Sequence, residues 1–160
     1  MTDAKPESKL WISGEDYVNI FSKVPRVCID LIIRGDKGVL LALRAIDPYI
    51  GMWHLPGGMI YKGESFLDAA KRVAKKEVGL DVVSAKIIDQ FEMLHEVRVD
   101  HVQHIISLVC EVKIKTGNSE GESLLLHDFQ SSELRYFSYN EVPGNLIPFH
   151  REALEKILNC

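Results

Sequence analysis

Glu77 is a carboxylate at a position where a helical pattern of apolar residues calls for an aliphatic side chain. If residues 65–80 form a helix, Glu77 falls on the same face as the apolar side chains between Phe66 and Val78. Gly79 is the expected C-cap, so Glu77 would lie in the last turn, where the helix dipole disfavours negative charge by about 0.3–1 kcal/mol. Partial burial of a carboxylate without a partner costs more. We therefore expect a cation, either an arginine or a metal ion, to meet Glu77.

Two glycines, Gly57 and Gly58, lie in a loop ahead of this predicted helix. Glycines let the backbone turn sharply and approach a ligand closely, so their carbonyl and amide groups can bind ions or phosphates. A site built from Glu77, a loop carbonyl and water suits a hard cation such as Mg²⁺. Bound to a diphosphate, Mg²⁺ would neutralise charge and orient the leaving group. These residues therefore indicate a magnesium site.

The segment from Gly58 to Leu80 resembles the Nudix box of hydrolases that cleave nucleoside diphosphates linked to another group. The residues in register with that motif are Gly58, Glu64, Arg72, Glu77, Gly79 and Leu80. Val73 and Lys76 stand where the family usually carries glutamates that hold extra metal ions or activate water. Because Glu77 is the glutamate that remains of this cluster, we expect a single Mg²⁺, for which Mn²⁺ can substitute.

Within the Nudix family, the similarity is to the GDP-mannose mannosyl hydrolase branch, which attacks the sugar carbon instead of phosphorus. The runs that resemble this branch are VPRVCIDLII, GVLLALRAIDPYIGMWHLPGG and LRYFSYNEV. The likeness covers most of residues 24–142. It implies a metal ion held by the Gly57 carbonyl, Glu77 and Gln130. It also implies substrate contacts from Asp30, Arg44 and His95, and a catalytic role for Arg72 on the diphosphate.

Two positions depart from that branch. Its general-base histidine follows the glutamine ligand directly, and Ser131 occupies that position here. Met59 replaces an arginine just after the two glycines. A serine cannot act as a base near neutral pH, so we expect His127, three residues before Gln130, to supply an imidazole of suitable pKa.

Several of these residues also have a structural interpretation. Arg72 lies five residues from Glu77, a poor spacing for an ion pair within one helix, so we favour metal binding by Glu77. Glu64 is expected to brace the loop before the helix. Asp30 is expected either to contact the sugar or to pair with Arg44 across a hairpin, and both interpretations remain open.

Three further residues are less informative. For His95, a surface or packing role is favoured over nucleotide contact. Gln130 would be an ordinary loop residue without the resemblance. Trp53 is expected in the core, with stacking on the substrate as the alternative.

The elements that would position these residues follow from turn signals and apolar periodicity. We expect helices over 13–22, over 65–78 and from Pro148 onwards, a hairpin turning at residues 35–38, and a loop over 47–62. Further strands are expected at 82–94, 104–115 and 134–138, with a polar loop over 116–132. Many strands and few helices favour an α/β fold with a mixed sheet covered on both sides, and the resemblance implies a Nudix-type α/β/α sandwich. Residues 1–12 are expected to form a flexible tail and residues 13–160 a single domain.

The composition favours an ordinary globular enzyme. The chain has 160 residues, of which 46% are hydrophobic and 26% charged, with a net charge of −4. This balance gives no reason to expect a nucleic-acid or membrane partner. We find neither an apolar run of roughly 20 residues nor the apolar core of a signal peptide. Three dispersed cysteines favour a reducing, cytoplasmic location, and the resemblance favours a homodimer.

Three functions are therefore carried forward. The leading one is Mg²⁺-dependent hydrolysis of a nucleoside diphosphate sugar, with GDP-mannose or GDP-glucose as first candidates and water attack at the anomeric carbon. The second is attack at phosphorus of another nucleoside diphosphate derivative, such as ADP-ribose. The third is a Nudix-fold binding module that has lost catalysis, consistent with Val73, Lys76 and Ser131.

Overall fold

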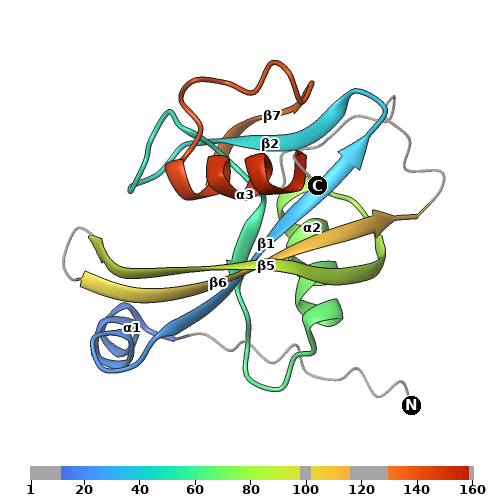
Figure 1. Cartoon of the computed structure of the whole chain (residues 1–160). Coiled ribbons are helices and arrows are strands. Elements are labelled where there is room, and N and C mark those ends of the chain that lie inside the picture. The colour runs from blue at the N-terminus through green and yellow to red at the C-terminus, as the bar shows by residue number, and fades with distance from the viewer. Residues whose placement is uncertain (1–11, 98–101, 116–129, 159–160) are drawn as a thin grey trace, which may run out of the picture.

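The computed structural model describes residues 12–97, 102–115 and 130–158, and all structural statements concern these residues. Three helices and seven strands are assigned within them (Figure 1). In chain order they are α1 (Gly14–Phe21), β1 (Arg26–Gly35), β2 (Gly38–Arg44), β3 (Trp53–His54), β4 (Gly57–Met59), α2 (Phe66–Val78), β5 (Val82–Val97), β6 (Val102–Ile114), β7 (Ser131–Phe137) and α3 (Pro148–Leu158).

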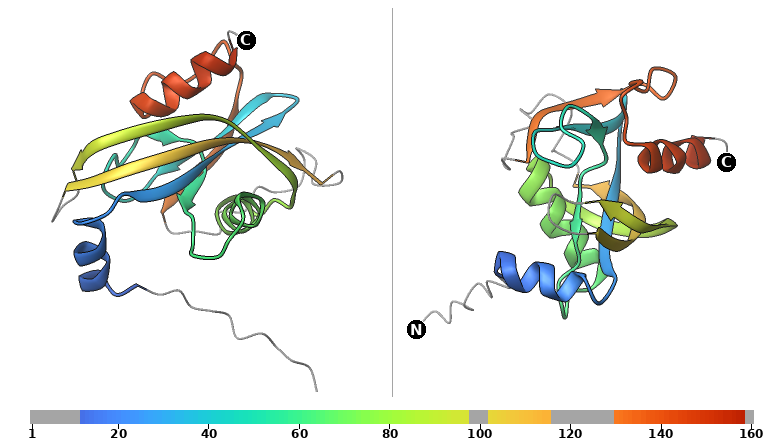
Figure 2. Two further views of the ribbon diagram at one scale, coloured as in Figure 1. Left: turned by 60° about the horizontal axis from the view of Figure 1, so that its bottom comes forward. Right: turned by 90° about the vertical axis from the view of Figure 1, so that its left-hand side faces the viewer.

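The strands form one mixed sheet with the order β3-β2-β1-β6-β5. β1 runs parallel to β6, and β4 and β7 pair with β1 and β2 respectively. α2 and α3 lie on opposite sides of the strands (Figure 2, left). This arrangement is an α/β/α sandwich, which confirms the predicted fold class.

β1 has a different apolar core on each of its two faces. Ile29, Leu31 and Ile33 are buried in the cluster that contains the apolar face of α2. Ile32 belongs to the other cluster, which contains Leu154 of α3. Alternation along a strand places Asp30 on the same face as Ile32. A carboxylate therefore interrupts the apolar face that α3 covers.

α2 begins and ends where the sequence predicts. Ser65 is the N-cap, and its hydroxyl accepts a hydrogen bond from the backbone N–H of Asp68 at 3.1 Å. Gly79 is the C-cap with φ 74°, a left-handed conformation that favours glycine. Glu77 therefore occupies the last turn of α2, as expected.

The predicted loops contain strands that the sequence does not reveal. The segment 47–62 includes β3 and β4, and β7 begins at Ser131, inside the expected loop 116–132. β3 has two residues and β4 has three, too few to show a period of two. The expectation that Trp53 is a core residue is confirmed, because its side chain is buried between β2, β7 and α3. Most of the N-terminal tail lies outside the described residues, and within those residues no helix is long and apolar enough to cross a membrane.

Candidate active site

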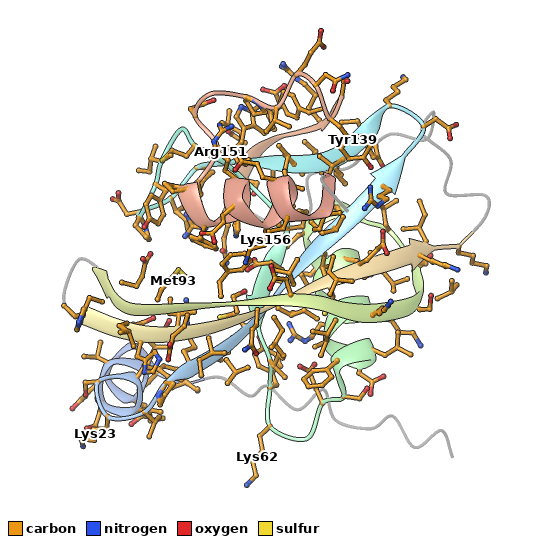
Figure 3. All side chains as sticks on the ribbon, viewed as in Figure 1. Lys23, Lys62, Met93, Tyr139, Arg151 and Lys156 are labelled. Carbon is orange, nitrogen blue, oxygen red and sulfur yellow. The ribbon has the colours of Figure 1, made fainter. Side chains whose placement is uncertain are left out.

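A pocket of about 150 Å³ lies between the central strands and the start of α3. It brings together six residues that the sequence analysis predicts for the site, namely Asp30, Arg44, Gly57, Gly58, Glu77 and Gln130. Met93 forms part of its wall and projects from β5 toward the side covered by α3 (Figure 3). Residues spread over 100 positions of the sequence therefore face one cavity, which we call the pocket.

Glu77 meets the glycine loop directly. Its Oε2 atom accepts a hydrogen bond from the backbone N–H of Gly57 at 3.0 Å, and the side chain is buried. Gly57 also lies opposite Asp30 in the β1–β4 pair. A Cβ on Gly57 would overlap Asp30 Oδ1 and lie 2.7 Å from the carbonyl oxygen of Ile29. Only glycine fits between these groups, so Gly57 places the loop between carboxylates from β1 and α2.

Asp30 is held by residues that the sequence analysis did not identify. Ser107 of β6 donates a hydrogen bond to Asp30 Oδ2, and Nε2 of His150 lies 3.4 Å from Oδ1. Burial alone would raise the pKa of Asp30, but the adjacent His150 and the Ser107 hydroxyl outweigh burial and lower it. The alternative ion pair between Asp30 and Arg44 is wrong. β1 pairs with β2 at the turn, whereas β4 lies beside Asp30.

His150 of α3 has its tautomer fixed by the backbone. Its Nδ1 atom accepts a hydrogen bond from the backbone N–H of Leu55 at 3.1 Å. Nδ1 therefore carries no proton, so the proton of the neutral ring is on Nε2, which faces Asp30. His150 thus ties α3 both to the segment before the glycine loop and to β1.

His54 of β3 has the opposite tautomer. Its Nδ1 lies 2.7 Å from the carbonyl oxygen of Leu55, which can only accept a hydrogen bond. Nε2 is therefore the unprotonated nitrogen, and it lies 3.5 Å from the hydroxyl oxygen of Ser131. Burial lowers the pKa of His54 to about 4, with the neighbouring His150 acting in the same direction. His54 is therefore neutral near pH 7 and has a lone pair on Nε2.

Arg44 and Gln130 are adjacent at the end of β2. The register of the β2–β7 pair shifts after Leu43, which places Ser131 opposite Arg44. The carbonyl oxygen of Gln130 accepts a hydrogen bond from the backbone N–H of Ala45 at 2.8 Å. The Arg44 guanidinium donates to the carbonyl oxygen of Pro48 in the following loop. This loop therefore orients a cation on the pocket wall.

Arg72 of α2 forms a bidentate ion pair with Glu64, which lies in the segment between β4 and α2. Its Nε lies 2.5 Å from Glu64 Oε1, and its Nη2 lies 2.8 Å from Glu64 Oε2 and from the carbonyl oxygen of Met59. Glu64 Oε2 also accepts a hydrogen bond from the backbone N–H of Tyr61 at 2.8 Å. The Arg72 hydrogen bond lowers the pKa of Glu64. These contacts hold residues 59–64 against α2, and neither side chain lines the pocket.

His95, a predicted substrate contact, does not line the pocket. His95 is exposed on β5, where the pairing with β6 shifts register between Met93 and Glu96. Met93 and Glu96 line the pocket in its place, and Glu96 accepts a hydrogen bond from the Tyr49 hydroxyl at 3.1 Å. His127 lies outside the described residues.

Arg26 is a further pocket residue that sequence reasoning missed. It precedes Cys28 and Asp30 at steps of two along β1, and all three line the pocket. Nη1 of Arg26 donates to the Tyr17 hydroxyl at 2.7 Å, whereas its buried Nε has no hydrogen-bond partner among the described residues. The spacing of two residues along an apolar strand could have identified it. His54 and His150 carry weaker signals, because only their proximity to the glycine loop and to a helix start marks them.

The donor atoms of the pocket fit a single hard cation. A carboxylate from Glu77, the amide side chain of Gln130 and the loop at Gly57 supply oxygen atoms, which Mg²⁺ prefers. In the described part of the chain no three His, Cys, Asp or Glu side chains form a metal-binding group. Glu77, Gln130 and the Gly57 carbonyl could hold such an ion together with water molecules.

The protein is therefore an α/β/α sandwich in which the carboxylate of Glu77, in the last turn of α2, contacts the glycine loop at Gly57. The sequence model of the NUDIX domain matches residues 24–157. The low-salt glycan biosynthesis protein Agl8 of Haloferax volcanii is 34% identical over 136 residues, which cover 83% of this chain and 82% of that protein. The ADP-ribose pyrophosphatase of Methanocaldococcus jannaschii is 29% identical over 132 residues, covering 82% of this chain and 72% of that enzyme.

A solved structure shares the fold. The MutT NUDIX hydrolase from Burkholderia pseudomallei superposes with a TM-score of 0.71 at 23% identity, covering 84% of this chain and 98% of that chain. The chain belongs to the Nudix hydrolase family, as its sequence predicts. Nudix hydrolases generally use divalent metal ions such as Mg²⁺.

Proposed function

We propose that the protein is a Mg²⁺-dependent hydrolase of a nucleoside diphosphate sugar in which water attacks the anomeric carbon. GDP-mannose and GDP-glucose are the first candidates. The observation that carries this proposal is that Glu77 is the carboxylate of α2 that lines the pocket. Val73 is buried beneath Gly58, and Lys76 is exposed. Attack at the anomeric carbon does not need a second metal ion to activate the water. A site with one helical carboxylate, which suits one metal ion, is therefore suited to this reaction.

The cationic residues of the pocket are suited to a departing diphosphate. Arg26 and Arg44 line the pocket, and guanidinium groups bind phosphate oxygens with two parallel hydrogen bonds. A bound Mg²⁺, held by Glu77, Gln130 and the Gly57 carbonyl, would neutralise further negative charge on the leaving group. In this proposal Arg72 contributes by holding the glycine loop in place through Glu64.

The polar floor of the pocket is suited to a sugar. Asp30, Ser107 and His150 offer a carboxylate, a hydroxyl and an imidazole N–H at the end of the pocket next to Gly57. Such groups bind the hydroxyls of a sugar in a specific orientation. The name of the Haloferax relative, a glycan biosynthesis protein, supports a sugar-linked substrate. The cytoplasmic location and the homodimer remain predictions.

A second function is attack at phosphorus of a nucleoside diphosphate derivative such as ADP-ribose. The relative named ADP-ribose pyrophosphatase, 29% identical to this chain, favours it. The same pocket would bind the diphosphate, and the two reactions differ in the atom that the water attacks.

The test is a panel of nucleoside diphosphate sugars and ADP-ribose with Mg²⁺ in ¹⁸O-labelled water, with products read by mass. We expect the label on the released sugar and an unlabelled nucleoside diphosphate. A label on phosphate would overturn the proposal and support the second function, attack at phosphorus. Tight binding without turnover of any member would indicate a binding module, and loss of activity in Glu77→Gln would exclude that module.

A further inference from the structure

We propose that His54 is the catalytic base that takes a proton from the attacking water through its Nε2 atom. The proposal rests on the proposed function, since it assigns a residue to that hydrolysis. His54 lies on β3 and lines the pocket, but neither its position in the sequence nor the resemblance assigns it a role.

The orientation of the His54 ring is fixed from two sides. Its backbone is held by the pairing of His54 with Ala42 of β2. Its Nδ1–H is committed to the carbonyl oxygen of Leu55 at 2.7 Å. Nε2 is thus the atom that remains for chemistry, and its lone pair is directed toward Ser131 Oγ at 3.5 Å. A base oriented in this way loses little conformational freedom when it meets a substrate.

Nε2 of His54 lies beside Ser131, and His54 lines the same pocket as the proposed metal ligands. Ser131 directly follows Gln130, and Leu55 is two residues before Gly57. A water molecule near these ligands would therefore lie close to Nε2. The loop thus brings a proton acceptor and the leaving-group site to the same end of the pocket.

The surroundings keep His54 unprotonated before the reaction. The charged or titratable groups that act on it are His150, Arg44 and Asp30. Burial, His150 and Arg44 lower the pKa of His54, whereas the Leu55 carbonyl and Asp30 raise it, and the net value is about 4. A bound diphosphate adds negative charge near the ring and would raise its proton affinity, because nearby negative charge favours the protonated form.

The other pocket groups are less suited to this role. His150 uses its Nδ1 lone pair to accept the Leu55 N–H, and its Nε2–H faces Asp30. Both oxygen atoms of the Asp30 carboxylate already have neighbours, because Oδ2 accepts a hydrogen bond from Ser107 and Oδ1 lies 3.4 Å from Nε2 of His150. Of the two described histidines that line the pocket, His54 is the one whose unprotonated nitrogen has a side-chain hydroxyl, Ser131 Oγ at 3.5 Å, as its neighbour instead of a backbone N–H. His127 is the competing candidate from the sequence.

The proposed step conserves atoms and charge. The water oxygen forms a bond to the anomeric carbon while one water proton moves to His54 Nε2. The bond between that carbon and the diphosphate oxygen breaks, and its electron pair leaves with the nucleoside diphosphate. The His54 imidazolium then releases its proton to solvent.

The experiment compares His54→Gln and His54→Ala with the wild type and with His127→Ala. Glutamine has a similar polar reach but cannot take up a proton. We expect His54→Gln to lower kcat by about 100- to 10,000-fold, the usual contribution of a general base, with KM changed less than about threefold. His104→Gln is the matched control, because His104 lies on β6 outside the pocket and contacts Glu92. Its kcat should equal that of the wild type.

Two further measurements separate a catalytic role from a structural one. Nucleotide binding by calorimetry and Mn²⁺ binding should be unchanged in His54→Gln. Added imidazole should restore part of the activity of His54→Ala by occupying the vacated space. If His54→Gln does not fold, the imidazole experiment on His54→Ala tests the role of His54 instead. A folded His54→Ala whose activity is not restored by imidazole would overturn the proposal.

The possible failures are distinguishable. If the wild type hydrolyses no nucleoside diphosphate sugar, the proposed function fails and the role of His54 fails with it. If the wild type is active and His54→Gln keeps its kcat within about threefold, only the assignment of His54 is wrong. A large loss of kcat in His127→Ala together with a normal His54→Gln would make His127 the base.

Discussion

The carboxylate of Glu77 and the backbone N–H of Gly57 are joined by a hydrogen bond of 3.0 Å, which connects the last turn of α2 to β4. This contact explains why a carboxylate is tolerated on the apolar face of the helix. A backbone donor meets one of its oxygen atoms, and a charge-assisted hydrogen bond of this kind offsets part of the cost of burial. The sequence predicts that a cation meets Glu77; the loop N–H is one partner that the structure shows, and, alongside the Glu64 hydrogen bond, the Glu77 charge also helps to raise the pKa of the Arg72 guanidinium.

We expect Glu77→Gln to abolish metal-dependent turnover without unfolding the protein. The glutamine carbonyl oxygen can still accept the Gly57 N–H, whereas the charge that binds Mg²⁺ is lost. Metal affinity and kcat should each fall by about 100-fold or more, since even indirect metal contacts contribute 10- to 100-fold. Mn²⁺ titration and turnover measurements check this, with exposed Lys76→Gln as the control. Unchanged metal affinity in Glu77→Gln would rule out Glu77 as a ligand.

Gly57→Ala should destabilise the fold. The added Cβ would overlap Asp30 Oδ1 and lie 2.7 Å from the carbonyl oxygen of Ile29. Forcing atoms into a packed site usually costs about 1–3 kcal/mol in the free energy of unfolding. Denaturant unfolding measures this cost, and Gly14→Ala is the control because no atom lies within 4 Å of its added Cβ. Equal stability of the two variants would show that β1 and β4 separate easily.

The ion pair between Glu64 and Arg72 should make stability depend on acid pH. Hydrogen bonding from Arg72 lowers the folded-state pKa of Glu64 below its ordinary value of 4.5. A lowered carboxylate pKa stabilises the fold above the unfolded-state value, and this contribution is lost as pH falls through the folded-state value. Glu64→Gln should therefore be less stable than the wild type at pH 7, and the gap should narrow below about pH 4.5.

Unfolding curves between pH 7 and pH 3 measure this difference. Exposed Glu141→Gln serves as the control and should track the wild type throughout. A constant gap for Glu64→Gln across the range would mean that the ion pair contributes no pH-dependent stability.

His150→Ala should lower the stability of the fold and weaken substrate binding in the pocket. It leaves the buried backbone N–H of Leu55 without its acceptor, a loss that costs about 1–3 kcal/mol. It also removes the N–H that faces Asp30. We expect a lower melting temperature and a higher KM, measured against Glu152→Gln on the exposed side of α3. A variant as stable as this control would contradict the role of His150 as a link.

Much of the scaffold could be predicted because its signals are local. α2 is marked by a cap at Ser65, an apolar stripe and Gly79, and all three lie within sixteen residues. The hairpin of β1 and β2 is marked by its glycines. Glu77 could be identified because a charge in an apolar stripe contradicts its immediate surroundings.

The rest of the site depends on contacts between distant residues. The hydrogen bond from Leu55 to His150 spans 95 positions, so no local pattern reveals it. His54 belongs to a strand of two residues, too short to show periodicity. The hairpin of β1 and β2 suggests Arg44 as the partner of Asp30. In the structure β4 pairs with β1 at Asp30, and the partners of Asp30 come from β6 and α3.

The hydrogen bond between Leu55 and His150 also has a consequence for folding during synthesis on the ribosome. Synthesis proceeds from the N-terminus at roughly 5–20 residues per second, so the Leu55 segment emerges well before α3. Until α3 docks, the Leu55 N–H lacks its acceptor and the wall carrying His150 is missing. A nascent chain would therefore complete the pocket only after α3 has been made. Ligand binding in the pocket would then distinguish chains that carry α3 from shorter nascent chains.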